Sequence, residues 1–190
     1  NQPNKEVRRI APFHPNGHPM SAEETEELLI KVLTIARNLT ILIEDLNTIY
    51  ADALPVRISG MLCNVRHRNA FVIFHIQSIA RLLPKILQNC KIIRYHFQLE
   101  PVSSSKDKLK DEIDIFSIAE KIVNKQHDDG NIRYFVYIYR EIKKIKGQFS
   151  QKMFYDACKE YVYDTPKTTT QLEKRRDSNG KKVYSYEEAV

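Results

Sequence analysis

The residues of this sequence that are best suited to a chemical role are basic side chains near its middle. Seven Lys and Arg residues, and no Asp or Glu, occur between Ala53 and Leu99. Lys and Arg bind nucleic-acid phosphates by displacing condensed counterions, without reading the base sequence. We expect one phosphate-binding helical face here, formed by Arg66, Arg68, Arg81 and Lys85.

A second basic group follows and is interleaved with tyrosines. Positive charge combined with aromatic surface is the mixture that binds single-stranded nucleic acid. For both groups two alternatives stay open: the basic residues bind an acidic protein partner, or they only solvate the surface of the domain. The second group comprises Arg140, Lys143, Lys144 and Lys146, among Tyr134, Tyr137 and Tyr139.

No residue pattern indicates a catalytic site. The sequence lacks G-x-x-x-x-G-K-[ST], G-x-G-x-x-G, H-E-x-x-H and G-x-S-x-G. Glu44 and Asp45 are adjacent, and neighbours on a helix point about 100° apart, so they are expected to be solvated. Cys158 and His75 lie in apolar runs and are expected in the core. We therefore expect no catalytic residue, no cofactor and no small-molecule substrate.

Cysteine and histidine spacing argues against metal binding and against disulfides. Cys63, Cys90 and Cys158 are far apart and odd in number. His14 and His18 are four residues apart, which is a ligand spacing only on a helix, and the prolines around them prevent a helix. We expect no metal site and a reducing intracellular compartment, with cytoplasm, nucleus and organelle matrix not distinguished.

One long helix over residues 21–54 is expected to position these side chains. Ser21 and Glu24 form a capping-box pattern at its start, and Pro55 ends it. Its apolar residues recur in alternating steps of four and three, which is the seam of a helix that packs on another helix. This predicted partner-helix interface comprises Leu28, Val32, Ile35, Leu39, Leu42, Leu46 and Ile49.

The rest of the chain is expected to be helical as well. Residues 70–97 repeat the four-and-three spacing, with a kink at Pro84, and residues 109–126 form an amphipathic helix. Residues 132–146 fit either a strand or a helix, and Gly147 with its preceding lysines favours the helix. Ser150 caps a last helix, with Phe149 and Phe154 as a hydrophobic staple.

These elements predict an all-α fold, a bundle of about five helices built on a long antiparallel helix pair. We expect an extended arm over residues 1–20, a helical bundle domain over 21–163, and a polar tail over 164–190 that is disordered or bound to a partner. The most apolar window contains His, Gln, Arg and Pro, so no membrane span is expected.

The function expected from these surfaces is that of a non-enzymatic subunit or adaptor in a larger intracellular assembly. Its formal net charge is +6, and its basic face would contact RNA or DNA while its long helices bind other protein subunits. The alternative is a pure protein-protein interaction module whose basic face binds an acidic partner.

Overall fold

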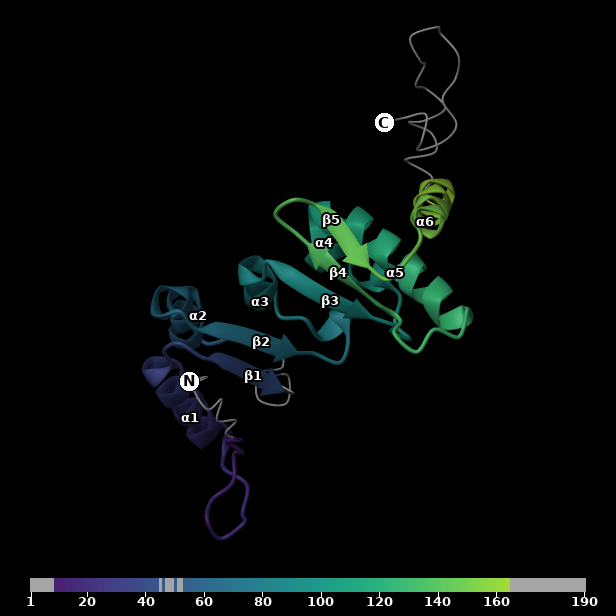
Figure 1. The fold of residues 1–190 in the computed structure, drawn as a ribbon. Helices are drawn as coiled ribbons and strands as arrows, with labels where there is room; N and C mark the ends of the chain where they lie inside the picture. The colour runs from purple at the N-terminus through teal and green to yellow at the C-terminus, as the bar shows by residue number, and fades with distance from the viewer. Residues whose placement is uncertain (1–8, 45, 47–49, 51–52, 165–190) are drawn as a thin grey trace, which may run out of the picture. The chain divides into compact units, whose positions relative to one another are not determined.

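The computed structural model describes residues 9–44, 46, 50 and 53–164 of the chain. The chain divides into two compact units (Figure 1). The first unit comprises Asn1–Gln77 and Arg81–Asn89, and the second comprises Ser78–Ala80 and Cys90–Val190. The boundary falls within the short 3-10 helix η3 (Ile79–Arg81), and each unit is described by itself below.

The first unit is built on a parallel strand pair with a helical connection. Strand β1 (Thr40–Glu44) pairs in parallel with β2 (Phe71–His75), in a register that runs from Thr40 opposite Phe71 to Glu44 opposite His75. Parallel neighbours require a crossover connection, and this one contains a helix, which makes a β-α-β unit. The helices of this unit are α1 (Ala22–Ile35), α2 (Val56–Asn64), the 3-10 helix η2 (Val65–Arg68) and α3 (Pro84–Asn89).

Within the described part of the chain, one face of this strand pair is covered and the other is exposed. Side chains alternate between the two faces of a strand, and those on the inner face pack on a core that includes Leu33, Leu46 and Ile58. The opposite face, which we call the outer face, comprises Thr40, Leu42 and Glu44 of β1 and Phe71, Ile73 and His75 of β2, all exposed.

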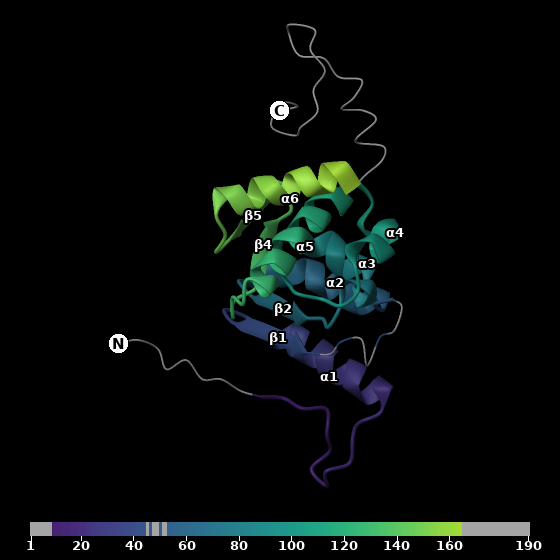
Figure 2. The ribbon, with the colours of Figure 1, turned by 90° about the vertical axis from the view of Figure 1, so that its right-hand side faces the viewer.

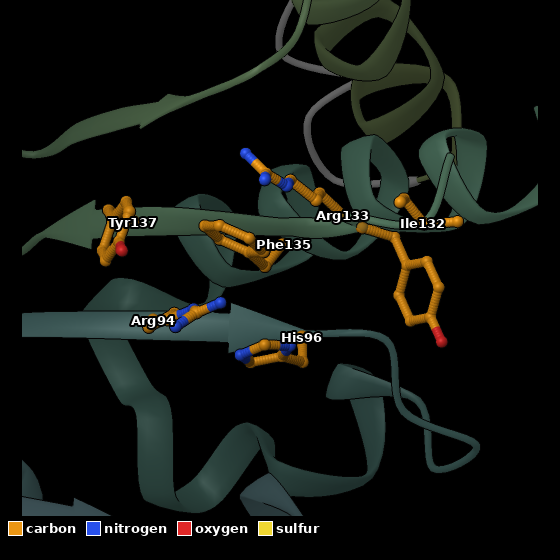
Figure 3. A pocket seen from close by; sticks show the side chains of 7 residues that line it. Arg94, His96, Ile132, Arg133, Phe135 and Tyr137 are labelled. Atoms are coloured by element: carbon orange, nitrogen blue, oxygen red, sulfur yellow. The ribbon is translucent and has the colours of Figure 1, made fainter. Parts of the chain in front are cut away.

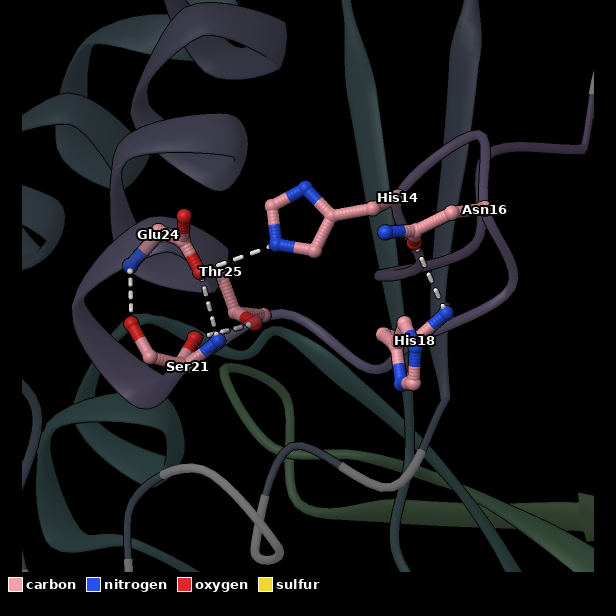
Figure 4. Close-up of polar contacts among 6 residues, drawn as sticks. All are labelled: His14, Asn16, His18, Ser21, Glu24 and Thr25. Carbon is pink, nitrogen blue, oxygen red and sulfur yellow. Dashed lines mark hydrogen bonds and ion pairs between the residues drawn. The ribbon is translucent and has the colours of Figure 1, made fainter.

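Helix α1 begins with the capping box that the sequence predicts (Figure 4). The Ser21 hydroxyl accepts a hydrogen bond from the Glu24 amide at 3.2 Å, and the Glu24 carboxylate accepts one from the Ser21 amide at 2.8 Å. The backbone hydrogen bond from Ser21 lowers the pKa of Glu24, and the nearby His14 lowers it further. The start of this helix is therefore fixed by local hydrogen bonds.

The helix predicted over residues 21–54 is wrong beyond Ile35, where α1 ends. Asn38 has a φ of 53°, a left-handed conformation that interrupts a helix and that Asn tolerates better than most residues. The β-branched residues that follow form β1, because pairing with β2 satisfies the backbone and buries the alternate side chains Ile41 and Ile43. The four-and-three spacing thus spans three different elements.

The second predicted long helix, over residues 70–97, is also wrong. This stretch forms β2, η3, α3 and β3 (Ile92–His96). Pro84 begins α3 rather than kinking a helix, which is the position where its missing N–H costs no hydrogen bond. The run of β-branched and aromatic residues in Phe71–His75 favours a strand once a parallel neighbour is present.

The second unit is a three-stranded antiparallel sheet with helices on one side. The strand order is β3-β4-β5, with β4 (Phe135–Tyr139) in the centre and β5 (Lys144–Gly147) at an edge. Helix α5 (Ile113–Asp128) contacts all three strands, and α6 (Gln151–Asp164) lies across α5 (Figure 2). The remaining short helices are η4 (Val102–Ser105), α4 (Lys106–Leu109) and η5 (Lys110–Glu112).

The core of this unit lies between α5, the sheet and α6. Its fully buried side chains come from all three: Phe116, Ile122 and Val123 on α5, Val136 and Ile138 on β4, and Ala157, Cys158 and Val162 on α6. The amphipathic helix predicted over residues 109–126 is confirmed from Ile113 onward as α5, whereas residues 109–112 belong to α4 and η5, and the last predicted helix is confirmed as α6. The Ser150 hydroxyl accepts from the Met153 amide at 3.1 Å, as its capping role requires.

Residues 132–146 are strands and not the helix that the sequence analysis favoured. Tyr137 and Tyr139 alternate with the buried Val136 and Ile138, which is the period of a strand. The lysines that suited a helix end lie instead at the β4–β5 turn, where Lys143 has a φ of 45°, and along β5. Pairing with β3 makes residues 135–139 a strand and not a helix.

The fold is therefore mixed α/β, and the predicted all-α bundle is wrong. Between residues 9 and 20 the chain makes a turn, closed by an isolated bridge between Phe13 and Pro19 with Gly17 at a φ of 84°. The predicted tail over 164–190 lies outside the described residues apart from Asp164. Of the helices in the described residues, none has the length and apolar character needed to cross a bilayer.

Candidate nucleic-acid interface

The sheet of the second unit leaves one face uncovered by helices, and that face carries aromatic and basic side chains. Because Val136, Ile138 and Tyr95 point into the core, their strand neighbours must point the other way. We call this surface the open face. It comprises Ile92, Arg94 and His96 on β3, Phe135, Tyr137 and Tyr139 on β4, and Lys144 and Lys146 on β5.

The strand register sorts these residues into three rows. The aromatic rings of β4 form the central row. On one side Arg94 lies opposite Tyr137 and His96 lies opposite Phe135. On the other side Lys146 lies opposite Tyr137 and Lys144 opposite Tyr139. The row of rings thus has Arg94 and His96 on one side and Lys144 and Lys146 on the other, with the apolar Ile92 opposite Tyr139, and β3, β4 and β5 contain no Asp or Glu.

A pocket lies at the end of the open face that carries Phe135 (Figure 3). Arg94 and His96 of β3 lie beside Phe135 and Tyr137 of β4. The segment before β4 supplies the rest of the lining, Ile132, Arg133 and Tyr134. The pocket is therefore lined by two arginines, one histidine and three aromatic rings.

The side chains of the open face contact the aromatic rings of β4. The Arg94 guanidinium lies 3.9 Å from the centroid of the Phe135 ring. The His96 ring centroid is 5.4 Å from that of Phe135, and Tyr137 meets Phe135 edge to face at 5.5 Å. Lys146 Nζ lies 5.1 Å from the centroid of the Tyr139 ring. Cations over ring faces hold these side chains in place without cancelling their charge.

Arg140 belongs to the predicted second basic group, but its charge is neutralised in the structure. Its guanidinium forms a two-pronged ion pair with Glu112, with a shortest distance of 2.6 Å, and also donates to the Cys90 carbonyl. Both side chains are largely buried. These contacts tie the residue after β4 to η5 and to Cys90, two residues before β3, so Arg140 has a structural role, whereas Lys143, Lys144 and Lys146 are exposed.

The first predicted basic group does not form one helical face. Arg68 donates to the carbonyls of Leu33 and Thr34 at 2.7 and 2.8 Å and so caps the end of α1. Arg81 and Lys85 are exposed, but Arg81 lies in η3 and Lys85 in α3, so the single helical wheel that joined them is wrong. The Arg66 side chain lies outside the described part of the chain. Phosphate contact by these residues stays a prediction.

The residues of the predicted partner-helix interface are likewise spread over several elements. Leu28, Val32 and Ile35 lie on α1, and Ile35 is 75% exposed. Leu39 precedes β1, Leu42 lies on the outer face, Leu46 is buried in the core, and Ile49 lies outside the described residues. They cannot form one seam, although contact of the exposed members with a partner stays a prediction.

The residues considered for catalysis are also placed differently from expectation. Glu44 ends a strand and not a helical turn, and His75, predicted to be buried, is exposed at the end of β2. Cys158 is buried in the core as predicted, and burial raises the pKa of its thiol to about 11. Among the described residues there is no cluster of three His, Cys, Asp or Glu side chains that could hold a metal ion.

The sequence analysis missed Arg94, His96 and Phe135 as members of the interface. It placed all three on helices, where Arg94 and His96 would not share a face with Tyr137. The signal that could have identified them is the period of two in Ile92–His96 and Phe135–Tyr139, where polar or aromatic residues alternate with buried apolar ones. The tyrosines and the β5 lysines of the second basic group were identified correctly as neighbours.

Comparisons of the chain with protein-family models, with curated proteins and with solved structures found no match. The functional argument therefore rests on the geometry of the open face and of the parallel strand pair.

Proposed function

We propose that this protein binds nucleic acid through the open face of its second unit. The observation that supports this proposal most strongly is the strand register, which sets a row of aromatic rings between Arg94 and His96 on β3 and Lys144 and Lys146 on β5. Phosphates bind Arg and Lys, and bases stack on aromatic rings, so both parts of a nucleotide find a complementary group. The proposed role is that of a binding subunit in a larger assembly, without catalysis on this face.

An acidic protein partner is the alternative for the same charges. It would be attracted by Lys144 and Lys146 and could pack on the rings, since aromatic residues are common in protein interfaces, but it has no repeating unit that joins a flat group to a negative charge. A nucleic acid uses both the charges and the rings. For this reason we place nucleic acid first, and we include competition by an acidic peptide in the test. The reducing intracellular setting remains part of the proposal, supported by three free cysteines in the described residues.

The proposal is tested by fluorescence-anisotropy titration of the full chain with labelled RNA and DNA of random sequence at two salt concentrations. The double variant Lys144→Glu with Lys146→Glu should weaken binding at least tenfold and reduce the salt dependence by about two phosphate contacts. The matched control is Lys106→Glu with Lys152→Glu, which makes the same charge change at exposed lysines on α4 and α6. Equal weakening by both double variants would overturn the assignment to the open face.

The parallel strand pair of the first unit supports a second candidate function, a site for magnesium and a nucleotide. In parallel α/β sheets ligands bind at the carboxyl ends of the strands, and Glu44 opposite His75 is the last pair of the register. A carboxylate after a buried strand holds Mg²⁺ in P-loop nucleotide hydrolases. Here Asp45 follows Glu44 in the sequence, but there is no G-x-x-x-x-G-K-[ST] segment, so another polypeptide segment would have to bind the phosphates.

This second candidate is tested by measuring Mn²⁺ binding by electron paramagnetic resonance with and without ATP. Glu44→Gln should abolish any ATP-dependent Mn²⁺ binding, while Glu23→Gln, an exposed carboxylate in the first turn of α1, should leave it unchanged. Equal Mn²⁺ binding by the two variants would remove the candidate.

A further inference from the structure

We propose that the nucleic acid bound by the open face is single-stranded, and that its bases stack on the central row of rings. This inference rests on the proposed function and specifies its ligand. Three observations lead to it: the spacing of the rings, the position of the basic rows, and the flat guanidinium of Arg94 over Phe135.

The spacing of the rings matches an extended strand and not a stacked one. Side chains on one face of a β-strand are separated by about 6.8 Å along the backbone, since each residue advances about 3.4 Å, and the ring centroids of Phe135 and Tyr137 are 5.5 Å apart. Successive nucleotides in a duplex advance only about 3.4 Å along the axis. The rings of Phe135, Tyr137 and Tyr139 can therefore meet successive bases only if the bases are splayed apart, which a single strand permits and a duplex does not.

A duplex would also leave the rings without a partner. Its bases are stacked on each other inside the helix, so a flat sheet can reach only phosphates and groove edges. A surface selected for duplex phosphates alone would gain nothing from aromatic side chains at its centre. On the open face these rings are half-buried and remain accessible between the basic rows.

The basic rows lie where the backbone of such a strand would run. With bases on the central β4 row, the sugar-phosphate chain must pass along one border of that row. Lys144 and Lys146 are register partners of Tyr139 and Tyr137, and the Lys146 ammonium lies 5.1 Å from the centroid of the Tyr139 ring. On the other border Arg94 and His96 flank Phe135. Three rings in line provide room for about three nucleotides.

Arg94 gives the platform a second stacking surface. Its guanidinium covers Phe135 at 3.9 Å, and planar guanidinium groups stack on bases as aromatic rings do. A base at this end of the row can therefore bind above Arg94, with Phe135 below it. Lysine would keep the charge here but has no flat surface, so Arg94→Lys separates stacking from charge.

The decisive experiment compares two ligands of equal length and charge. One is a labelled nine-nucleotide oligothymidine, and the other is the same phosphodiester chain with abasic tetrahydrofuran units in place of the nucleosides. The full chain should bind oligothymidine at least tenfold more tightly than the abasic chain, and more tightly than a nine-base-pair duplex. Equal affinities for oligothymidine and the abasic chain would overturn base stacking.

Protein variants assign the effect to the open face. Phe135→Leu with Tyr137→Leu should lower the affinity for oligothymidine at least tenfold and leave binding of the abasic chain unchanged, and Arg94→Lys should act in the same direction. The control is Tyr155→Leu with Tyr163→Leu on α6, and far-ultraviolet circular dichroism establishes that each variant is folded. A loss shared by both ligands or by the control would overturn the placement of the bases.

The same measurements distinguish phosphate binding on the open face from base stacking on its rings. If neither ligand binds at low salt, the proposed function and this inference both fail. If both bind equally and Lys144→Glu with Lys146→Glu weakens both, phosphate binding on the open face stands and base stacking fails. If oligothymidine is preferred and the ring variants remove the preference, both stand.

Discussion

The two units each contain a small sheet with one uncovered face, and the two faces differ in chemistry. On the outer face of the first unit Leu42, Phe71 and Ile73 are 58%, 67% and 52% exposed. On the open face of the second unit the exposed positions carry Arg, His and Lys around half-buried rings. Parallel sheets normally have both faces covered, whereas antiparallel sheets commonly leave one face in water. The first face is therefore the kind that another element covers, and the second is the kind that binds a charged ligand.

The largest effect is expected from charge placed in the core under the first face. Leu33 is fully buried, so Leu33→Asp should cost at least about 4 kcal/mol and unfold the first unit. Leu39→Asp, which the all-helical interpretation would have made equally damaging, should cost about 1 kcal/mol or less because Leu39 is 43% exposed. Urea denaturation followed by circular dichroism measures both. Equal destabilisation would place Leu39 in the core after all.

The second prediction compares the thiols of the two units. Cys158 in the second unit is buried, and its pKa is raised to about 11, whereas Cys63 in the first unit is exposed. The thiolate is the reactive form, so at pH 8 Cys63 should react with a maleimide at least about a hundredfold faster. Mass spectrometry of the labelled chain identifies the modified residue.

Because deprotonation of Cys158 is disfavoured in the folded state, stability should fall as the pH rises through 9 towards 11, and Cys158→Ala should remove this part of the decline.

The third prediction concerns the ion pair that supports the second face. Arg140→Ala leaves Glu112 largely buried without its partner and should cost about 2 kcal/mol. The control is Lys91→Ala, which breaks an exposed pair with Glu141 and should cost less than about 1 kcal/mol. Thermal melting of the parent protein and of the two variants ranks the losses of stability. A milder effect of Arg140→Ala than of Lys91→Ala would contradict the structural role assigned to the pair of Arg140 with Glu112.

Part of this comparison could be predicted from the sequence and part could not. Capping by Ser21 and Ser150, the amphipathic α5, and the mixed charge and aromatic character around Tyr137 are local signals, and the structure confirms them. The strands could not be predicted in the same way, because a five-residue apolar run has the same composition in a buried helix and in a strand. Pairing between segments distant in the sequence, such as β1 with β2, decided those cases.

The sequence analysis also missed both uncovered faces, because it assigned their strands to helices. A seam of apolar residues spaced by four and three was assigned to one helix, which put Leu42 in a helix interface. In the structure Leu42 lies on a strand, opposite Ile73. Once β3 and β4 are recognised as strands, the period of two places Arg94, Tyr137 and Lys146 on one surface, so one correct assignment of strand period would have revealed the interface.

The smallest effects on stability are expected from substitutions on the two uncovered faces. The faces should instead differ in their effects on self-association and on nucleic-acid affinity. Replacing the exposed Phe71 and Ile73 by Thr should change the free energy of unfolding by about 1 kcal/mol or less. Replacing the half-buried Phe135 and Tyr137 by Leu should cost about 2 kcal/mol or less, because each position keeps an apolar side chain. In sedimentation velocity the Phe71→Thr with Ile73→Thr variant should self-associate less than the parent, because it removes exposed apolar surface. Phe135→Leu with Tyr137→Leu should leave association unchanged and lower only nucleic-acid affinity. If instead the second pair altered association and the first altered nucleic-acid binding, the two faces would have to exchange their assigned roles.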